Sequence, residues 1–157
     1  MRTLGAVRVP VPLCRAAYRG AYAALRTYWF LRRPDIQGVK CVLTDGDRVL
    51  LVRHTYGHRA WDLPGGAVRR GEPPAATARR EMHEELGVQI DDWRPIGEIR
   101  GHIDHRNDTM HCFHTELGPQ PLTLDLCELD TAQWFPRSQL PRDLGRFVIE
   151  ILDLAAA

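Results

Sequence analysis

The order of apolar and polar positions along the chain predicts a helix followed by a hairpin of two strands. Apolar residues recur at helical spacing over 13–33, and the run ends before Pro34, since the residue that precedes a proline disfavours a helix. Residues 38–44 alternate between apolar and polar side chains, and 48–54 return after them as a partner strand. The dipeptide between these runs, Asp45-Gly46, is typical of a hairpin turn.

The later part of the chain predicts a second hairpin and a closing helix. Residues 94–103 and 109–117 indicate two strands joined by a turn over 104–108. The apolar stripe over 142–154 predicts an amphipathic helix. By contrast, 1–12 is expected to be irregular, because its prolines interrupt helical hydrogen bonding.

The helix predicted over 13–33 is basic on one side and moderately apolar on the other. Its arginine stripe consists of Arg15, Arg19, Arg26 and Arg33, and opposite it lie Leu13, Ala17, Ala24, Tyr28 and Leu31. We expect the apolar side to pack on the rest of the chain or on a second subunit, within a homodimer. A helix on a membrane surface and a cleaved targeting peptide are the open alternatives, and membrane binding is not the expected one.

Composition and charge are those of a single globular domain. The chain has 157 residues, 44% of them hydrophobic and 26% charged. Residues 1–36 hold seven arginines and one acid, which leaves 14 basic and 19 acidic residues from the totals of 21 and 20, so we expect attraction between the two parts. The four cysteines show no metal-binding spacing and predict reduced thiols in a cytoplasmic protein. No apolar run reaches the length of a membrane span.

The stretch with the strongest chemical signal lies near the middle of the chain. A proline pair precedes 74–86 and a glycine follows it, which predicts a helix over these residues. On that helix Glu81, Glu84 and Glu85 share one face, where they repel one another unless a cation neutralises them. Mg²⁺ takes oxygen ligands and often shares them with substrate phosphates. Arg80, four residues before Glu84, can hold one of these carboxylates in place.

The stretch 66–88, GAVRRGEPPAATARREMHEELGV, resembles the Nudix box, the signature of the MutT/Nudix hydrolase superfamily. The family pattern is a glycine, five residues, a glutamate, seven residues, and then Arg-Glu-hydrophobic-x-Glu-Glu-x-Gly-hydrophobic. Its fixed positions are filled here by Gly66, Glu72, Arg80, Glu81, Met82, Glu84, Glu85, Gly87 and Val88. A surface helix of solvated charge is the alternative for a shorter acidic run, and the complete pattern argues against it.

The resemblance implies an α/β fold, the Nudix-type α/β/α sandwich with a mixed, curled sheet. It covers roughly 38–155. We therefore expect a basic N-terminal segment with an extra amphipathic helix at 1–36 and a Nudix hydrolase domain at 37–157.

The resemblance also implies roles for the box residues. Glu81, Glu84 and Glu85 would bind Mg²⁺ or Mn²⁺, and Glu81 is also a candidate base. Either Gly65 or Gly66 would add a backbone carbonyl to the metal.

Other residues would support these glutamates. Arg80 would orient one of the box carboxylates, Glu72 would brace the loop, and Gly87 would end the helix. Glu128 stands six residues before Trp134, an offset at which several family members carry a glutamate that joins the metal site or acts as a base. A solvated loop acid is the alternative for Glu128.

The loop before the box is expected to border the substrate. Arg53 and Arg59 are candidate phosphate contacts, because a planar guanidinium suits phosphate oxygens. Tyr56 and Trp61 are candidate contacts to the rest of the substrate, but for Trp61 we expect packing beneath the loop, with stacking on a base as the alternative.

The implied reaction is hydrolysis of a nucleoside diphosphate linked to another moiety, X, to a nucleoside monophosphate and phospho-X. The first alternative is a (deoxy)nucleoside triphosphate pyrophosphohydrolase of the MutT kind, and the second is a nucleotide-binding regulator without activity. The proline that often marks ADP-ribose hydrolases is absent, since Ile103 stands at that offset. We expect a nucleotide as the partner and no nucleic acid polymer.

Overall fold

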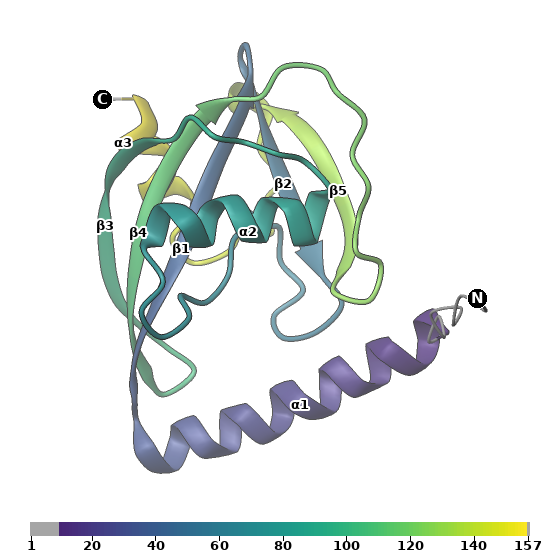
Figure 1. Cartoon of the computed structure of the whole chain (residues 1–157), viewed down its shortest axis with the longest axis vertical. Coiled ribbons are helices and arrows are strands. Elements are labelled where there is room, and N and C mark those ends of the chain that lie inside the picture. The colour runs from purple at the N-terminus through teal and green to yellow at the C-terminus, as the bar shows by residue number, and fades with distance from the viewer. Residues whose placement is uncertain (1–9, 157) are drawn as a thin grey trace, which may run out of the picture.

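A computed structural model describes residues 10–156 of the chain (Figure 1). Its elements are α1 (Val11–Arg32), β1 (Asp35–Asp45), β2 (Arg48–His54), α2 (Pro74–Leu86), β3 (Arg94–Ile103), β4 (Arg106–Glu116), β5 (Leu129–Pro136), the 3₁₀ turn η1 (Arg137–Gln139) and α3 (Val148–Ala156). Most of the segment expected to be irregular, 1–12, lies outside the described residues. In the part described, Pro10 precedes α1 and Pro12 lies in its first turn, where prolines begin a helix without breaking it.

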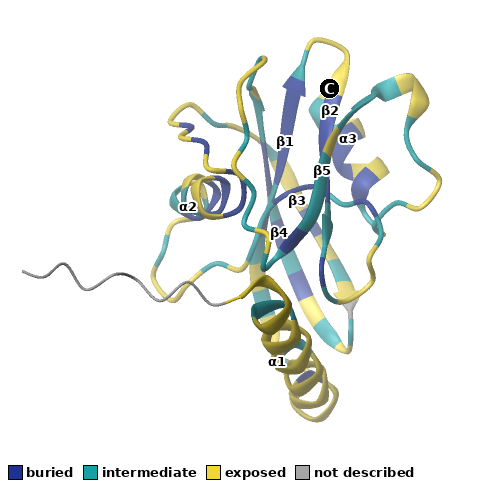
Figure 2. Ribbon diagram, turned by 90° about the vertical axis from the view of Figure 1, so that its right-hand side faces the viewer, coloured by how far each residue is buried: buried dark blue, intermediate teal, exposed yellow. Residues whose placement is uncertain are grey.

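Within residues 10–156, five strands form one mixed sheet in the order β3-β4-β1-β2-β5. The β1–β4 pair is parallel, and the β1–β2, β2–β5 and β3–β4 pairs are antiparallel. Helices α2 and α3 lie on opposite faces of the sheet (Figures 1 and 2). The predicted α/β/α sandwich with an additional N-terminal helix is therefore confirmed.

Strands β1 and β2 pair only close to their hairpin and diverge beyond it (Figure 1). The segment 61–68 fills the space between them. The Val39 and Cys41 amides donate to the carbonyls of Gly66 and Pro64 at 2.8 and 2.9 Å, while Val52 pairs with Asp62. This inserted segment brings the start of the box under α2.

Hydrophobic clusters on the two faces of the sheet hold the layers together. On the α2 side, Val39, Leu50 and Met82 are fully or almost fully buried. On the α3 side, Leu51 and Ile151 are similarly buried. Strands β1, β2, β4 and β5 contribute side chains to both clusters, as the period of a strand allows, whereas β3 contributes to the cluster on the α3 side.

Three predicted boundaries were wrong, and the first of them is the start of β1, which lies at Asp35 and not at residue 38. The last helix begins at Val148, because the residues before it bond to the loop: the Trp61 amide donates to Asp143 and the Gly145 amide donates to Trp61, at 2.9 and 2.7 Å. The turn of the second hairpin is shorter than predicted. It consists of Asp104 and His105, both with positive φ, so β4 begins at residue 106.

Helix α1 lies across one end of the sheet (Figure 1) and contacts the body with its polar side. Arg15 pairs with Asp130 at 3.1 Å, and Arg26 lies 3.6 Å from Asp104. The buried residue of this helix is Trp29, and most of the remainder is exposed (Figure 2). The apolar side therefore does not pack on the rest of this chain, as one form of the prediction had it, and its packing on a second subunit stays a prediction.

The apolar stripe of α1 instead faces outward. Leu13, Tyr28 and Leu31 are 62%, 51% and 72% exposed. The usual rule fails here because the surface that receives the helix is acidic, so the arginines find their partners on it. The expected attraction between the basic segment and the acidic body is thus present within one chain.

The cysteines also differ from the prediction. Cys14 of α1 and Cys127 of the loop before β5 form a disulfide across 113 positions, with their Cα atoms 5.5 Å apart. Cys41 and Cys112 are buried free thiols. The spacing of cysteines in the sequence could not indicate this pair, because only the fold brings them together. None of the helices in the described part of the chain is long and apolar enough to cross a membrane.

Candidate active site

Two of the three clustered box glutamates point into the protein from the inner side of α2. Glu81 is 8% exposed and Glu85 is 1% exposed. Gly66 lies directly against the Glu81 carboxylate, where a Cβ atom would collide with it, so a residue without a side chain is needed there. The Gly65 amide donates to Glu85 Oε2 at 3.2 Å.

Gly65 and Gly66, the candidates for a backbone ligand to the metal, both lie against β1. The Gly66 carbonyl accepts a hydrogen bond from the amide of Val39, which ties it to the sheet. Gly65 has φ 149° and approaches the Val39 carbonyl so closely that a Cβ atom would clash with it. Both glycines therefore allow the close contact of α2, the inserted segment and β1.

Arg80 donates to five acceptor atoms around the box. It binds both carboxylate oxygens of Glu72 at 2.9 and 3.0 Å, Glu81 at 2.6 Å and Glu84 at 3.0 Å. Its remaining bond goes to the carbonyl of Ala67 at 3.2 Å. The hydrogen bonds from Arg80 lower the pKa of Glu72 to about 2. Arg80 thus fixes the loop through Glu72 and orients two of the box carboxylates.

A second group of ligand-type side chains meets Glu85 from outside the box. His54, at the end of β2, and Glu128, in the loop before β5, join Glu85, and the candidate ligand atoms of the three residues lie within 4.8 Å of one another. His54 Nε2 stands 3.5 Å from Glu85 Oε1. The hydroxyl of Tyr56 donates to Glu128 Oε1 at 2.7 Å.

Burial makes these carboxylates difficult to ionise. It raises the pKa of Glu81 to about 7, against the opposing effect of Arg80. It also raises the pKa of Glu85, against the opposing effect of His54. Among residues 10–156, buried Oε1 of Glu85 finds no hydrogen-bond donor. A buried carboxylate oxygen without a donor, beside an imidazole and a second carboxylate, fits a site for a divalent cation.

Glu84 lies at the surface of α2 and is not part of the group formed by His54, Glu85 and Glu128. Its side chain is 47% exposed, and it pairs with Arg80 and also with Arg69 at 3.3 Å. The face of α2 expected to carry three glutamates thus carries two buried carboxylates and one at the surface.

The predicted substrate contacts divide into two groups. Tyr56 lies beside Glu128, and Arg59 pairs with Asp130 at 2.9 Å in the same region. Arg53 and Trp61 lie elsewhere: the Arg53 guanidinium is 4.6 Å from the centre of the Trp61 ring.

Trp61 belongs to the cluster on the α3 side, where its ring packs edge-on against Phe135 at 4.9 Å. The structure therefore does not bring Arg53 and Trp61 to the glutamates. The reason is the period of a strand, since neighbouring residues of β2 point to opposite faces.

The same period could have identified His54, which the sequence analysis missed. Leu50 and Val52 of β2 belong to the cluster beneath α2, so the next alternate position, His54, lies on the α2 side as well. That signal depends on knowing which face of β2 the box helix covers.

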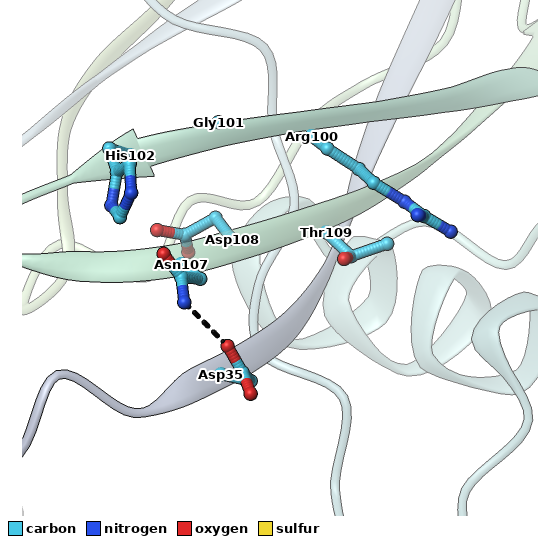
Figure 3. A pocket seen from close by; sticks show the side chains of 7 residues that line it. All are labelled: Asp35, Arg100, Gly101, His102, Asn107, Asp108 and Thr109. Atoms are coloured by element: carbon cyan, nitrogen blue, oxygen red, sulfur yellow. Dashed lines mark hydrogen bonds between the residues drawn. The ribbon is translucent and has the colours of Figure 1, made fainter.

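A separate shallow pocket lies at the ends of β1, β3 and β4 (Figure 3). Its lining includes Arg100, His102 and Thr109, and Asn107 donates to Asp35 at 2.7 Å beside them. Within the described part of the chain, none of the box glutamates lines this pocket. We do not assign it to the chemistry of the box.

Comparisons with known proteins agree with this geometry. A sequence model of the NUDIX domain matches residues 34–154. An ADP-ribose pyrophosphatase of Mycobacterium tuberculosis is 48% identical over 48 residues, which cover 30% of this chain and 23% of that protein. An RNA pyrophosphohydrolase of Legionella pneumophila is 32% identical over 83 residues, which cover 53% and 45%. The chain thus spans less than half the length of either relative.

A solved structure shows the same fold. The MutT NUDIX hydrolase from Burkholderia pseudomallei aligns with a TM-score of 0.71 at 19% identity, over 76% of this chain and 97% of that one. The NUDIX match spans most of the 157 residues and contains every residue of the box. The chain therefore belongs to the NUDIX domain family.

Proposed function

We propose that the chain is a divalent-metal-dependent pyrophosphohydrolase that cleaves a nucleoside diphosphate linked to a moiety X into a nucleoside monophosphate and phospho-X. The observation that carries this proposal is the buried Oε1 atom of Glu85, which has no hydrogen-bond donor among the described residues. The candidate ligand atoms of Glu85, His54 and Glu128 lie within 4.8 Å of one another, close enough to share one cation. A regulator that only binds nucleotides would not need this group of buried, mutually repelling carboxylates.

In this proposal Glu85, Glu81 and Glu128 hold the cation, and Glu84 completes the site from its exposed edge. When bound, the cation offsets the negative charge of the phosphates and makes water a stronger nucleophile. The carboxylate oxygens suit Mg²⁺. With the imidazole of His54 as an additional ligand, Mn²⁺ is equally suitable. Hydrogen bonds from Arg80, Gly65 and Tyr56 hold the carboxylates of Glu81, Glu85 and Glu128, so these ligands are oriented before the substrate binds.

The protein residues have distinct tasks in the reaction. Glu81 is the candidate base, because its carboxylate is fixed by Arg80 and faces the small residue Gly66. Glu72 keeps Arg80 in place through its paired hydrogen bonds. Tyr56 keeps Glu128 turned toward the cluster.

The relatives' names support a substrate with a pyrophosphate bond. The Mycobacterium tuberculosis relative is named an ADP-ribose pyrophosphatase, which is a nucleoside diphosphate-X activity. The Legionella pneumophila relatives are named RNA pyrophosphohydrolases, so RNA becomes a second candidate substrate, although the sequence predicted no nucleic acid polymer as a partner. A (deoxy)nucleoside triphosphate is the third.

One experiment distinguishes these candidates. Purified protein is incubated with ADP-ribose, nucleoside diphosphate sugars, nucleoside triphosphates and 5′-triphosphate RNA, with Mg²⁺ or Mn²⁺, and phosphate is measured after a coupling phosphatase. We expect turnover of a nucleoside diphosphate-X compound that stops in EDTA and falls about 100-fold or more in Glu85→Gln.

The control is Arg79→Ala, which changes an arginine on the same helix that pairs with Asp91 and not with the box. Its turnover should equal that of the original protein. Equal turnover in EDTA, or equal turnover by Glu85→Gln, would overturn the metal-dependent mechanism. Turnover of triphosphates alone would replace the first substrate with the other candidates.

A further inference from the structure

Helix α1 is attached to the loop that carries Glu128 on both sides of that residue. Cys14 forms its disulfide with Cys127, the residue immediately before Glu128. Arg15 donates to the carbonyl of Leu126 at 2.8 Å and to the carboxylate of Asp130 at 3.1 Å. One turn of α1 therefore contacts the loop before the candidate metal ligand and the first residues of β5 after it.

The same helix also contacts the residue that orients Glu128. Tyr18 stacks on Tyr56 with ring centres 5.7 Å apart and planes at 16°, and Tyr22 packs on Tyr56 at 5.3 Å. The Tyr56 hydroxyl donates to Glu128 Oε1. The aromatic side chains of α1 thus limit the movement of the ring whose hydroxyl holds Glu128.

A third connection runs through Thr55. Arg19 of α1 donates to the Thr55 carbonyl at 3.1 Å. The Thr55 amide donates to the carbonyl of Glu128, and its hydroxyl donates to the carbonyl of Cys127, both at 2.8 Å. The loops that follow β2 and precede β5 are therefore joined to each other and to α1.

Little apolar burial holds the N-terminal half of α1. Its buried residue, Trp29, lies near the other end of the helix, under the guanidinium of Arg106 at 3.9 Å. Val11 and Leu13 at the N-terminal end are 38% and 62% exposed. The covalent bond of Cys14 is thus the strongest link between this half of α1 and the Glu128 loop.

We propose that α1 is a positioning element for Glu128 and that the Cys14–Cys127 disulfide makes this positioning depend on thiol–disulfide exchange. The inference rests on the proposed metal-dependent function and adds a control of its metal site. A dithiol reductant breaks the Sγ–Sγ bond with two electrons, leaves two protein thiols and becomes a cyclic disulfide itself. The loop that carries Glu128 is then held only by the noncovalent contacts of α1.

The oxidised protein should bind the cation more tightly than the reduced one. Residues that orient metal ligands commonly change metal affinity 10- to 100-fold, so we expect a loss of about 10-fold on reduction. The change should reverse on reoxidation, because neither Cys14 nor Cys127 belongs to the hydrophobic clusters that hold the layers of the domain together. On reduction, kcat should decrease by a larger factor than KM increases, since Glu128 is placed at the cation that acts in the reaction and not at the rest of the substrate.

The test is a titration of Mn²⁺ into the metal-free protein, followed by water-proton relaxation, before and after treatment with dithiothreitol. Alkylation and mass spectrometry identify the two states: only Cys41 and Cys112 should react in the unfolded oxidised protein. Cys127→Ser is the matched control. Its affinity should equal that of the reduced protein and should not respond to dithiothreitol.

A second variant leaves the disulfide intact. Tyr56→Phe keeps the ring against α1 but removes the hydroxyl bond to Glu128, and it should lower the Mn²⁺ affinity of the oxidised protein by a similar factor. Equal Mn²⁺ affinity in the oxidised and reduced proteins would overturn this inference and leave the proposed function standing. Failure of both forms to bind Mn²⁺ or Mg²⁺ would overturn both.

Discussion

Replacing Glu85 with glutamine should stabilise the metal-free protein and remove the stabilisation that a cation provides. Glu85 is 1% exposed, and its Oε1 atom finds no donor among residues 10–156. Glutamine has nearly the same shape without the charge. Its amide oxygen can still accept from the Gly65 amide, as Glu85 Oε2 does at 3.2 Å.

The size of the effect follows from the cost of an unsatisfied buried group. Such a group costs about 1–3 kcal/mol, and more when it is charged. For a chain of this length, about 1 kcal/mol shifts the midpoint of thermal unfolding by about 2–4 °C. We therefore expect Glu85→Gln to raise the metal-free midpoint by about 2–12 °C. A cation present at about 100 times its Kd should add about 2.7 kcal/mol to the original protein alone.

Thermal unfolding is followed by circular dichroism in EDTA and in excess Mg²⁺ or Mn²⁺. The order of stability of the two proteins should reverse or become equal when the cation is added. Glu84→Gln is the control, since the same change at a side chain that is 47% exposed should alter the metal-free stability by less than about 0.5 kcal/mol. A metal-free Glu85→Gln less stable than the original protein would refute the reasoning.

Three further outcomes are expected. In EDTA, the free energy of unfolding should decrease by about 1–2 kcal/mol as the pH rises from about 4.5 through about 7, because burial raises the pKa of Glu81 from 4.5 to about 7 and the folded state favours the protonated carboxyl. Denaturant unfolding at several pH values measures this, and a free energy that increases over the range would contradict it. Gly66→Ala should reduce turnover by at least about 10-fold by displacing Glu81, whereas Gly46→Ala, at a turn with open space, should not change turnover. Trp29→Ala should increase amide exchange in the C-terminal half of α1 without changing that of α2, because it removes the contact with Arg106; unchanged exchange in α1 would show that other contacts suffice.

The box could be predicted in detail because its geometry is local. Glu81 and Glu85 are four residues apart on one helix, so their spacing alone places both on one face. The bounds of that helix, Pro74–Leu86, match the prediction for the same reason. His54 could not be placed in this way, since its proximity to Glu85 depends on how β2 packs under α2.

The prediction for α1 was right that the helix exists and packs on the domain, and wrong that its apolar side would face this chain. An amphipathic pattern indicates which side of a helix is apolar, and it gives the packed side only when the receiving surface is apolar too. Here the receiving surface offers Asp104 and Asp130, and the arginines turn toward it. The positions of these two acids in the folded protein cannot be read from the distribution of charge along the sequence.

The balance of forces on α1 explains why one covalent bond matters so much there. Each partly exposed ion pair between the arginines and the body contributes about 0.2–1 kcal/mol, so Arg15 and Arg26 together provide about 0.4–2 kcal/mol. Salt weakens these pairs further. A disulfide stabilises a folded protein by about 2–4 kcal/mol and, unlike an ion pair, does not open through thermal motion. While Cys14 and Cys127 are joined, the first turns of α1 stay beside Glu128 at any ionic strength; once they are reduced, salt should determine how much of the time they remain there.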